Sequence, residues 1–378
     1  MVYKIRESNA DRTILVPSKT MGIIIFIIKV IGLIFLLPGL LVLFSEEPLD
    51  NIVFILSGIG LTFFVGGSMA SSYASKLPGK MVFNNTLGKL QIFDKIGKFT
   101  RREESAFLSY NEIANFGIRK IRFNNSVSYG VYLEKKDAAI WDLFQSNSEN
   151  KAREFLQQVE NNIDFRPKKD KNQTDVNQGA VIGFTTDSEN YKIEKTDTKA
   201  TIIWRRKLEL FNTLSMLVFL FGFTLVFYSA KDEMEQVGRI IAFIFLAVVN
   251  SLVLWGIFVS LFSRFHLTIE PNEITYTKFF LKKPVKTAKI ESSILHSVLF
   301  HFNVSSGHSA IFLLTAEQNQ MLSKINKGEA GLGDVFAAFK AHKGSLKIYG
   351  TSLSFSEKVR LEKTIQSLIT EITGRQNL

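Results

Sequence analysis

The sequence predicts an α+β membrane protein, built as a tandem duplication of a transmembrane α-hairpin and a β-rich domain. Three observations support this prediction: two pairs of long apolar runs, a short motif that occurs twice, and strand-like segments after each pair of runs. The apolar runs occupy residues 21–70 and 211–263. Each half of each pair has roughly twenty apolar residues, enough for one helix to cross a hydrocarbon core of about 30 Å. We therefore expect four transmembrane helices.

The placement of lysine and arginine predicts the orientation of these spans, because short cytoplasmic segments are enriched in both residues. The leader carries Lys4 and Arg6, whereas the turn at 45–51 is acidic and has no basic residue. Arg205 and Arg264 flank the second pair of runs. The pattern predicts a multi-pass protein of the cytoplasmic (inner) membrane, with both termini in the cytoplasm and integral contact with lipid.

The internal repeat is visible as identical residues at a constant spacing in the sequence. The triplet Tyr-Lys-Ile at 3–5 recurs at 191–193, and Thr-Ile at 13–14 recurs at 201–202, in each case 188 positions later (191 minus 3). Apolar residues alternate with polar ones in both leaders, which favours two short strands and a turn. An irregular arm is the alternative interpretation of each leader.

The segments after each pair of runs are short and rich in Val, Ile, Phe and Tyr, as expected of antiparallel strands. A change to helical spacing follows in both copies. Ser148 is a candidate cap for a helix whose apolar stripe includes Phe155 and Val159. Ser354 or Ser356 is the corresponding candidate in front of the final helix. Each copy is therefore expected to end its β-rich domain with one amphipathic helix.

This layout resembles that of bacterial membrane proteins in which a two-helix hairpin precedes a pleckstrin-homology-like domain. The residues that carry the resemblance are KMVFNNTLGKLQIFDK at 80–95 and HLTIEPNEITYTKFFLKKPVKTAKI at 266–290. The chain departs from the family pattern around residues 291–302 and in a long insertion. The resemblance implies two antiparallel barrels or sandwiches, each with a C-terminal helix, and it implies little chemistry.

These observations divide the chain into seven segments, one of which contains an insertion. The expected boundaries are 1–20 for the N-terminal β leader, 21–70 for the first transmembrane hairpin, 71–165 for the first pleckstrin-homology-like domain, 166–187 for a linker, 188–210 for the second leader, 211–263 for the second hairpin, and 264–378 for the second domain with an insertion at 317–344. The insertion is either functional or merely tolerated at a loop tip.

Composition and motifs point away from enzyme chemistry. The chain has 378 residues, a formal net charge of +11 and no cysteine. Disulfides, thiolate metal sites and cysteine nucleophiles are therefore excluded. Motifs for phosphate loops, serine hydrolases, zinc proteases and EF-hands are absent. His296 and His301 are an odd number of residues apart, so a straight strand would point them to opposite faces. We expect no catalytic residue, no cofactor and no metal.

The net positive charge has a simple explanation in the topology signal and in attraction to anionic lipid, so no nucleic-acid partner is expected. Basic clusters in the β-rich domains are the candidate sites for a lipid headgroup or a protein partner, and an apolar face in the insertion is a further candidate. The candidate binding residues are Arg101, Arg102, Lys282, Lys283, Lys286, Lys289, Val335, Phe336 and Phe339.

The function expected from these features is that of a non-enzymatic membrane scaffold or adaptor that binds protein partners through its two cytoplasmic domains. Self-association through the glycine-bearing stretch 58–67 is part of this hypothesis, because glycines let helices approach closely. Two alternatives stay open: a subunit of a membrane transporter or channel complex, and a sensor of anionic lipid.

Overall fold

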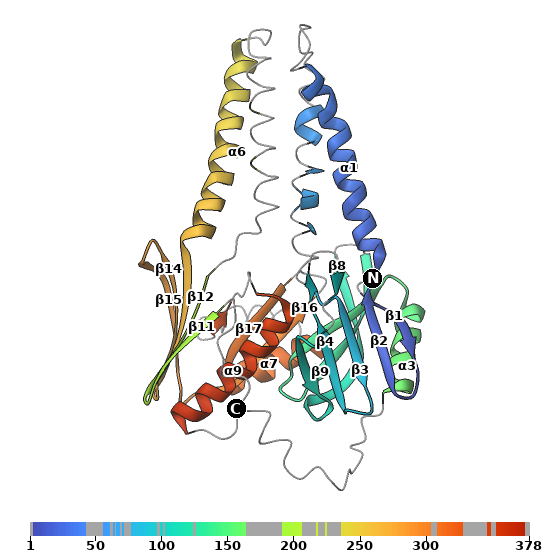
Figure 1. The fold of residues 1–378 in the computed structure, drawn as a ribbon, viewed down its shortest axis with the longest axis vertical. Helices are drawn as coiled ribbons and strands as arrows, with labels where there is room; N and C mark the ends of the chain where they lie inside the picture. Colours follow the sequence, from blue (N-terminus) through green and yellow to red (C-terminus); the bar gives the residue numbers. More distant parts are fainter. Residues whose placement is uncertain are drawn as a thin grey trace. The chain divides into compact units, whose positions relative to one another are not determined.

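The structure is a computed structural model of the 378-residue chain (Figure 1). It describes residues 3–42, 56–60, 63–64, 66–68, 70–71, 77–96, 99–100, 103–123, 126–163, 191–205, 217, 224, 236–303, 308–327, 346–348 and 353–374.

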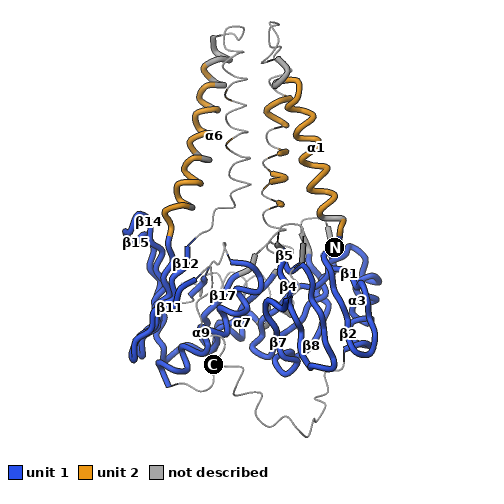
Figure 2. Tube along the Cα trace, viewed as in Figure 1, with its two compact units in different colours: residues 1–18, 76–205, 264–378 blue, residues 19–75, 206–263 orange. Residues whose placement is uncertain are grey.

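The chain divides into two compact units, and neither unit corresponds to one copy of the repeat. Unit 1 comprises 1–18, 76–205 and 264–378, and unit 2 comprises 19–75 and 206–263 (Figure 2). Each copy of the sequence repeat therefore contributes to both units. Unit 1 contains the β-sheets apart from Ser263, the first residue of β13, and the other described residues of unit 2 are helical.

Two five-stranded antiparallel sheets in unit 1 have the same strand order. The first sheet has the order β1-β2-β3-β4-β7 and the second has the order β11-β12-β13-β14-β15. The strands of the first sheet are β1 (Tyr3–Ser8), β2 (Arg12–Pro17), β3 (Lys80–Asn84), β4 (Lys89–Phe93) and β7 (Ala106–Ser109). Those of the second sheet are β11 (Tyr191–Thr196), β12 (Lys199–Arg205), β13 (Ser263–Ile269), β14 (Glu273–Phe280) and β15 (Lys283–Glu291).

Each leader forms the β-hairpin that its alternating pattern predicts, and that hairpin begins its sheet. Equivalent residues of the two copies are 188 positions apart in the leaders. After the apolar runs they are three positions closer. Leu15 pairs with Met81, whereas Ile203, the counterpart of Leu15, pairs with His266. Met81 and His266 are thus equivalent at a spacing of 185 (266 minus 81).

A third, central sheet has six strands and contains strands from both copies. Its order is β18-β17-β16-β10-β9-β8. The strands are β8 (Ile113–Phe123), β9 (Ser126–Lys135), β10 (Ile140–Ser146), β16 (Leu295–Asn303), β17 (His308–Thr315) and β18 (Leu346–Ile348). All of the pairs are antiparallel except β10 with β16, which run parallel where the two copies meet, with Trp141 opposite Phe302.

The helices of unit 1 pack on these sheets. Helix α3 (Glu149–Asn162) is capped by Ser148, as the sequence predicts, and its Phe155 stacks on Phe144 with ring centroids 4.5 Å apart. Helix α9 (Phe355–Thr373) has Ser354 as its cap and ends at Gly374 in the left-handed conformation. The remaining short elements are η1 (Tyr110–Glu112), α7 (Ala316–Lys327), β5 (Lys95–Ile96) and β6 (Phe99–Thr100).

The predicted barrels need correction. The sequence pattern and the family resemblance imply one pleckstrin-homology-like barrel or sandwich in each copy. The last three strands of each copy instead join edge to edge in one six-stranded sheet, through the β10–β16 pair. An edge strand exposes unpaired N–H and C=O groups, and pairing two such edges satisfies both. The chain is therefore of mixed α and β structure, with a sheet that belongs to both copies.

Two segments named in the sequence analysis lie largely outside the described residues. The linker at 166–187 is one of them. Of the insertion at 317–344, residues up to 327 are described, and they form the helix α7 rather than a loop.

Unit 2 contains two long described helices, α1 (Lys19–Val42) and α6 (Gln236–Phe262). Phe26 and Ile34 on α1, and Phe243 and Trp255 on α6, are more than half exposed. Gly32 of α1 lies against Gly60 of the described residues 56–60. The two backbones are so close there that neither glycine has room for a Cβ atom. The glycine therefore allows a close approach within one copy.

The predicted membrane topology is also contradicted. Within the residues that the structure describes, no helix has both the length and the apolar character needed to cross a membrane. Such a crossing requires about 20 consecutive apolar residues in one helix. The run at 52–70 is described only in part, and of the run at 211–230 only residues 217 and 224 are described. The predictions of four transmembrane helices, of a membrane protein, and of a multi-pass inner-membrane location with cytoplasmic termini are corrected accordingly.

The close approach at Gly60 generates a prediction. A Cβ at Gly60 would lie 2.7 Å from the carbonyl oxygen of Gly32, whereas a Cβ at Gly66 would have no atom within 4 Å. We expect Gly60→Ala to lower the free energy of unfolding by about 1–3 kcal/mol, because the two backbones must separate. The control Gly66→Ala should be neutral or stabilising by up to about 1 kcal/mol. Thermal unfolding followed by circular dichroism measures both, and equal effects would contradict the packing.

Candidate binding surface

Strands β14 and β15 form a hairpin (Figure 1). Its buried residues lie near the base, and the residues of β15 toward the tip are exposed. Ile274 faces Ile290 near the base, and both side chains are buried. Two residues, Leu281 and Lys282, connect the strands, and both have positive φ angles of 50° and 67°. Positive φ at both central residues is the geometry of a type I′ turn, whose twist matches that of the flanking strands. The alternating sequence thus forms a hairpin that extends beyond the core.

The turn is made from residue types that rarely occupy it. Asn and Gly are preferred in type I′ turns, and a non-glycine residue with positive φ is uncommon. Leu281 is 49% exposed and Val285 is 63% exposed, so neither side chain gains burial within the described chain. Backbone conformations of this kind concentrate at functional sites. The hairpin therefore presents two apolar side chains, and it holds one of them, Leu281, at a conformational cost.

The same tip concentrates positive charge. Lys278 and Lys286 lie directly opposite each other on the two strands, and Lys282 and Lys283 lie at the turn. Like charges on directly opposed positions destabilise a sheet. Among the described residues, no carboxylate lies within 4 Å of these four ammonium groups. We call Lys278, Leu281, Lys282, Lys283, Val285 and Lys286 the hairpin tip.

Lys289 differs from the lysines of the tip. Its ammonium group is 2.8 Å from Glu273 on the neighbouring strand. The hydrogen bond from Lys289 lowers the pKa of the Glu273 carboxyl. Lys289 is therefore neutralised within the sheet, and the uncompensated charge is confined to the tip.

The structure places the sequence-predicted binding residues unequally. Lys282, Lys283, Lys286 and Lys289 all lie on the β14–β15 hairpin. Arg101, Arg102, Val335, Phe336 and Phe339 lie outside the described residues. Lys278, Leu281 and Val285 are binding candidates that were not predicted from the sequence. The alternation in TYTKFFLKKPVK, read as a hairpin centred on 281–282, would have placed all three at the tip.

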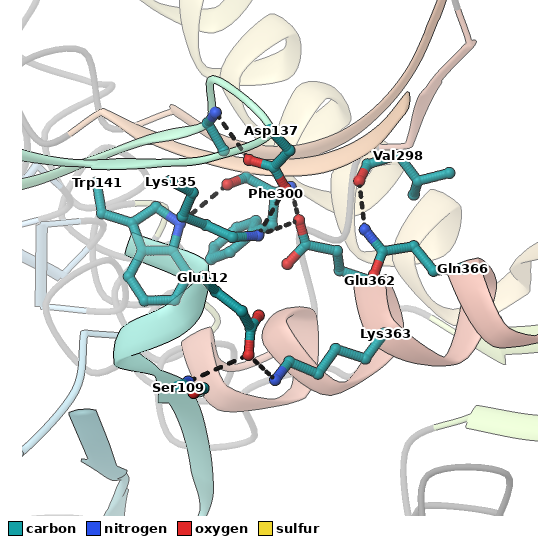
Figure 3. Close-up of polar contacts among 11 residues, drawn as sticks. Ser109, Glu112, Lys135, Asp137, Trp141, Val298, Phe300, Glu362, Lys363 and Gln366 are labelled. Atoms are coloured by element: carbon teal, nitrogen blue, oxygen red, sulfur yellow. Dashed lines mark hydrogen bonds and ion pairs between the residues drawn. The ribbon is translucent and has the colours of Figure 1, made fainter. Parts of the chain in front are cut away.

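A second group of charged residues is buried where the two copies meet, and Figure 3 shows its contacts. The ammonium group of Lys135, at the end of β9, is 2.7 Å from Glu362 Oε1 on α9 and 2.9 Å from Asp137 Oδ2. The backbone N–H of Phe300 also donates to Glu362 Oε1, at 2.6 Å. Lys135 is 4% exposed and Glu362 is fully buried. One side chain of each copy thus forms the central ion pair.

Burial and charge act in opposite directions on this pair. Burial alone would lower the pKa of Lys135, but the Glu362 and Asp137 carboxylates raise it above its ordinary value. Burial raises the pKa of Glu362 to about 7, although the Lys135 ammonium lowers it. The second oxygen of Glu362 is buried without a hydrogen-bond partner in the described structure. The pair is therefore sensitive to the loss of either member.

Further contacts attach α9 to the first copy. Lys363 forms an ion pair with Glu112 at 2.9 Å, and Ser354 donates to Asp94 at 3.1 Å. The ring centroids of Phe355 and of Trp141 on β10 are 5.0 Å apart. The indole N–H of Trp141 in turn donates to the carbonyl oxygen of Phe300 at 2.9 Å. Helix α9 of the second copy is therefore anchored on strands and loops of the first.

This cluster was not predicted from the sequence, although the sequence carries a signal for part of it. Glu362 is three residues from both Val359 and Ile365, so it falls on the apolar stripe of the predicted helix. A carboxylate on such a stripe requires a buried cationic partner. No local pattern indicates that the partner is Lys135, which is 227 positions away along the chain.

The histidines of the central sheet do not form a metal site in the described part of the chain, where no group of three potential ligands is found. Burial, together with the Arg119 and Lys347 charges, lowers the pKa of His301 to about 3. His301 is therefore neutral at physiological pH.

Comparison with known proteins adds no relative. The chain matches no family model, and neither a curated protein nor a solved structure is significantly similar to it. These comparisons do not identify the pleckstrin-homology-like family that the sequence resembles.

The buried pair generates a prediction about stability. We expect Lys135→Met to lower the free energy of unfolding by about 3–5 kcal/mol, because the Glu362 carboxylate remains buried without its counter-charge. The double variant K135M/E362M should lose less than K135M alone, since two apolar side chains then fill the same space. Urea unfolding of K135M, E362M and the double variant measures this coupling.

A matched control for these variants is Glu149→Gln, which removes the exposed ion pair with Arg153. Its effect should be much smaller than that of K135M, because an exposed ion pair is screened by solvent. A double variant whose loss equals the sum of the single losses would show that Lys135 and Glu362 do not act as a pair.

The pKa of Glu362 predicts a pH dependence. Because this pKa rises from an ordinary 4.5 to about 7, the folded chain holds a proton that the unfolded chain releases. The resulting stabilisation is present below about pH 4.5 and is lost as the pH rises through about 7. The stability of the wild type minus that of Glu362→Gln should therefore fall between about pH 5 and pH 8. A difference that stays constant or increases over this range would refute the assignment.

Proposed function

We propose that this protein is a non-enzymatic adaptor whose hairpin tip binds an acidic segment of a protein partner. The single observation that carries the proposal is the opposed pair Lys278–Lys286, accompanied by Lys282 and Lys283, with no carboxylate in ion-pair distance among the described residues. A folded chain that places like charges opposite each other loses stability. A ligand with negative charge would remove that cost when it binds.

The apolar part of the tip narrows the type of ligand. Leu281 and Val285 are exposed beside the lysines, so the surface offers apolar contact as well as charge. Exposed ion pairs alone contribute little and are screened by salt, whereas burial of apolar area contributes about 25 cal/mol per Å². We expect the partner segment to combine acidic residues with at least one aliphatic or aromatic side chain.

The proposal is tested with a synthetic peptide of alternating glutamate and leucine, labelled for fluorescence anisotropy. The full-length protein should bind it, and the variant K278Q/K282Q/K283Q/K286Q should bind at least tenfold more weakly. The loss should be larger at low salt than at high salt, because part of the attraction is screened.

The matched control is K4Q/K136Q/K151Q/K324Q, which removes the same charge from exposed lysines elsewhere. If this control weakens binding as much as the tip variant, the attraction is general and the proposal fails. Vesicles with anionic phosphatidylserine form the second arm. Tip-dependent binding to these vesicles without binding to the peptide would replace the protein partner with a lipid surface.

A further inference from the structure

We infer that the acidic partner segment binds in an extended conformation, as a sixth strand along the free edge of β15. This inference rests on the proposed function and specifies the conformation of its ligand. A strand at the edge of a sheet presents a row of N–H and C=O groups that can pair with another chain. Addition of a peptide strand to such an edge is a general mode of recognition, in which the backbone supplies affinity and the side chains supply specificity.

The edge of β15 is open along most of its length. In the order of the second sheet, β15 pairs with β14 and with no further strand among the described residues. Seven of its nine residues are exposed, and the fully buried one is Ile290 near the base. Residues of β15 approach β18, but the two strands do not pair. The backbone of 285–289 is therefore accessible to a ligand.

The equivalent strand of the first sheet provides an internal comparison. β7 has the same fifth position in its sheet, but it has four residues, and Ala106 and Leu108 are buried. Helix α9 packs against β7, with the ammonium group of Lys363 4.8 Å from the centre of the Phe107 ring. One copy thus has a short last strand that packs against a helix, whereas the other copy has a long last strand that is exposed.

The lysines of β15 give the edge its selectivity. Lys286 and Lys289 are three residues apart and point to opposite faces of the strand. The register shift beside Val285 brings Lys283 to the same face as Lys286, because their partners Phe280 and Lys278 are two residues apart on β14. Lysine on an edge strand discourages pairing with chance neighbours. A strand with glutamates along it would place a carboxylate beside Lys286, whose charge has no carboxylate within ion-pair distance among the described residues, while the small side chains of Thr287 and Ala288 leave room next to it. The edge therefore favours an acidic strand over a neutral one.

The experiment uses the full-length protein and three synthetic ten-residue peptides. The parent peptide has glutamate at every third position, with valine and threonine between. The other two peptides have the same sequence and are N-methylated at every second residue, one at the odd positions and the other at the even positions. Each pattern of methylation blocks backbone pairing on one edge of the peptide and preserves its charge. We expect the parent to bind, and one N-methylated peptide to bind at least tenfold more weakly. Hydrogen exchange at the amides of 285–289 should slow when the parent binds.

The outcomes separate the two proposals. If both N-methylated peptides bind as tightly as the parent, strand addition is wrong, and recognition of the peptide by the lysine charges stands. If the parent does not bind, or binds equally well to K278Q/K282Q/K283Q/K286Q, the proposed function itself is wrong. Binding of the parent without slower exchange in β15 would also overturn strand addition, because the ligand would then lie elsewhere on the hairpin.

Discussion

The fold depends on the junction at which strand β10 of the first copy pairs with strand β16 of the second. The junction brings Lys135 next to Glu362, and it places the Trp141 indole within hydrogen-bond distance of the Phe300 carbonyl oxygen. Because Lys135 and Glu362 are fully desolvated, neither charge is tolerated without the other. Helix α9 must therefore pack on the first copy. The β-rich parts of the two copies consequently form one folded unit and not two independent domains joined by a linker.

This constraint also explains why two copies of similar sequence have different surfaces. The helix that packs on the junction also contacts β7, and the four residues of that strand are buried or half-buried. The corresponding strand β15 has no such neighbour among the described residues, and its hairpin continues past the buried Ile274–Ile290 pair into solvent. Duplication supplied two equivalent edges, and head-to-tail packing covered one of them. The exposed edge is the one that carries the lysines.

Local features were predictable from the sequence, and long-range pairing was not. The alternation after Tyr3 and the caps Ser148 and Ser354 each depend on neighbours within a few residues, and the structure has these features. The parallel pairing of Trp141 with Phe302 joins positions more than 150 residues apart, so no periodicity records it. Long apolar runs were interpreted as membrane spans from their length and from the lysines and arginines around them, and both are local signals. The lysines at 282, 283, 286 and 289 were predicted as binding residues because they are close together in the sequence. The opposition of Lys278 to Lys286 was not predicted, because it exists only once the hairpin forms.

Native-state hydrogen exchange of the full-length chain tests the central claim most directly, because it measures which segments open together. If α9 joins the two copies, its amides should open at the same free energy as those of β10 and β16, in the slowest-exchanging group of the protein. Amides of α9 that open at a clearly lower free energy than those of β10 and β16 would contradict the account, since the helix would then be an independent element and not the connection between the copies.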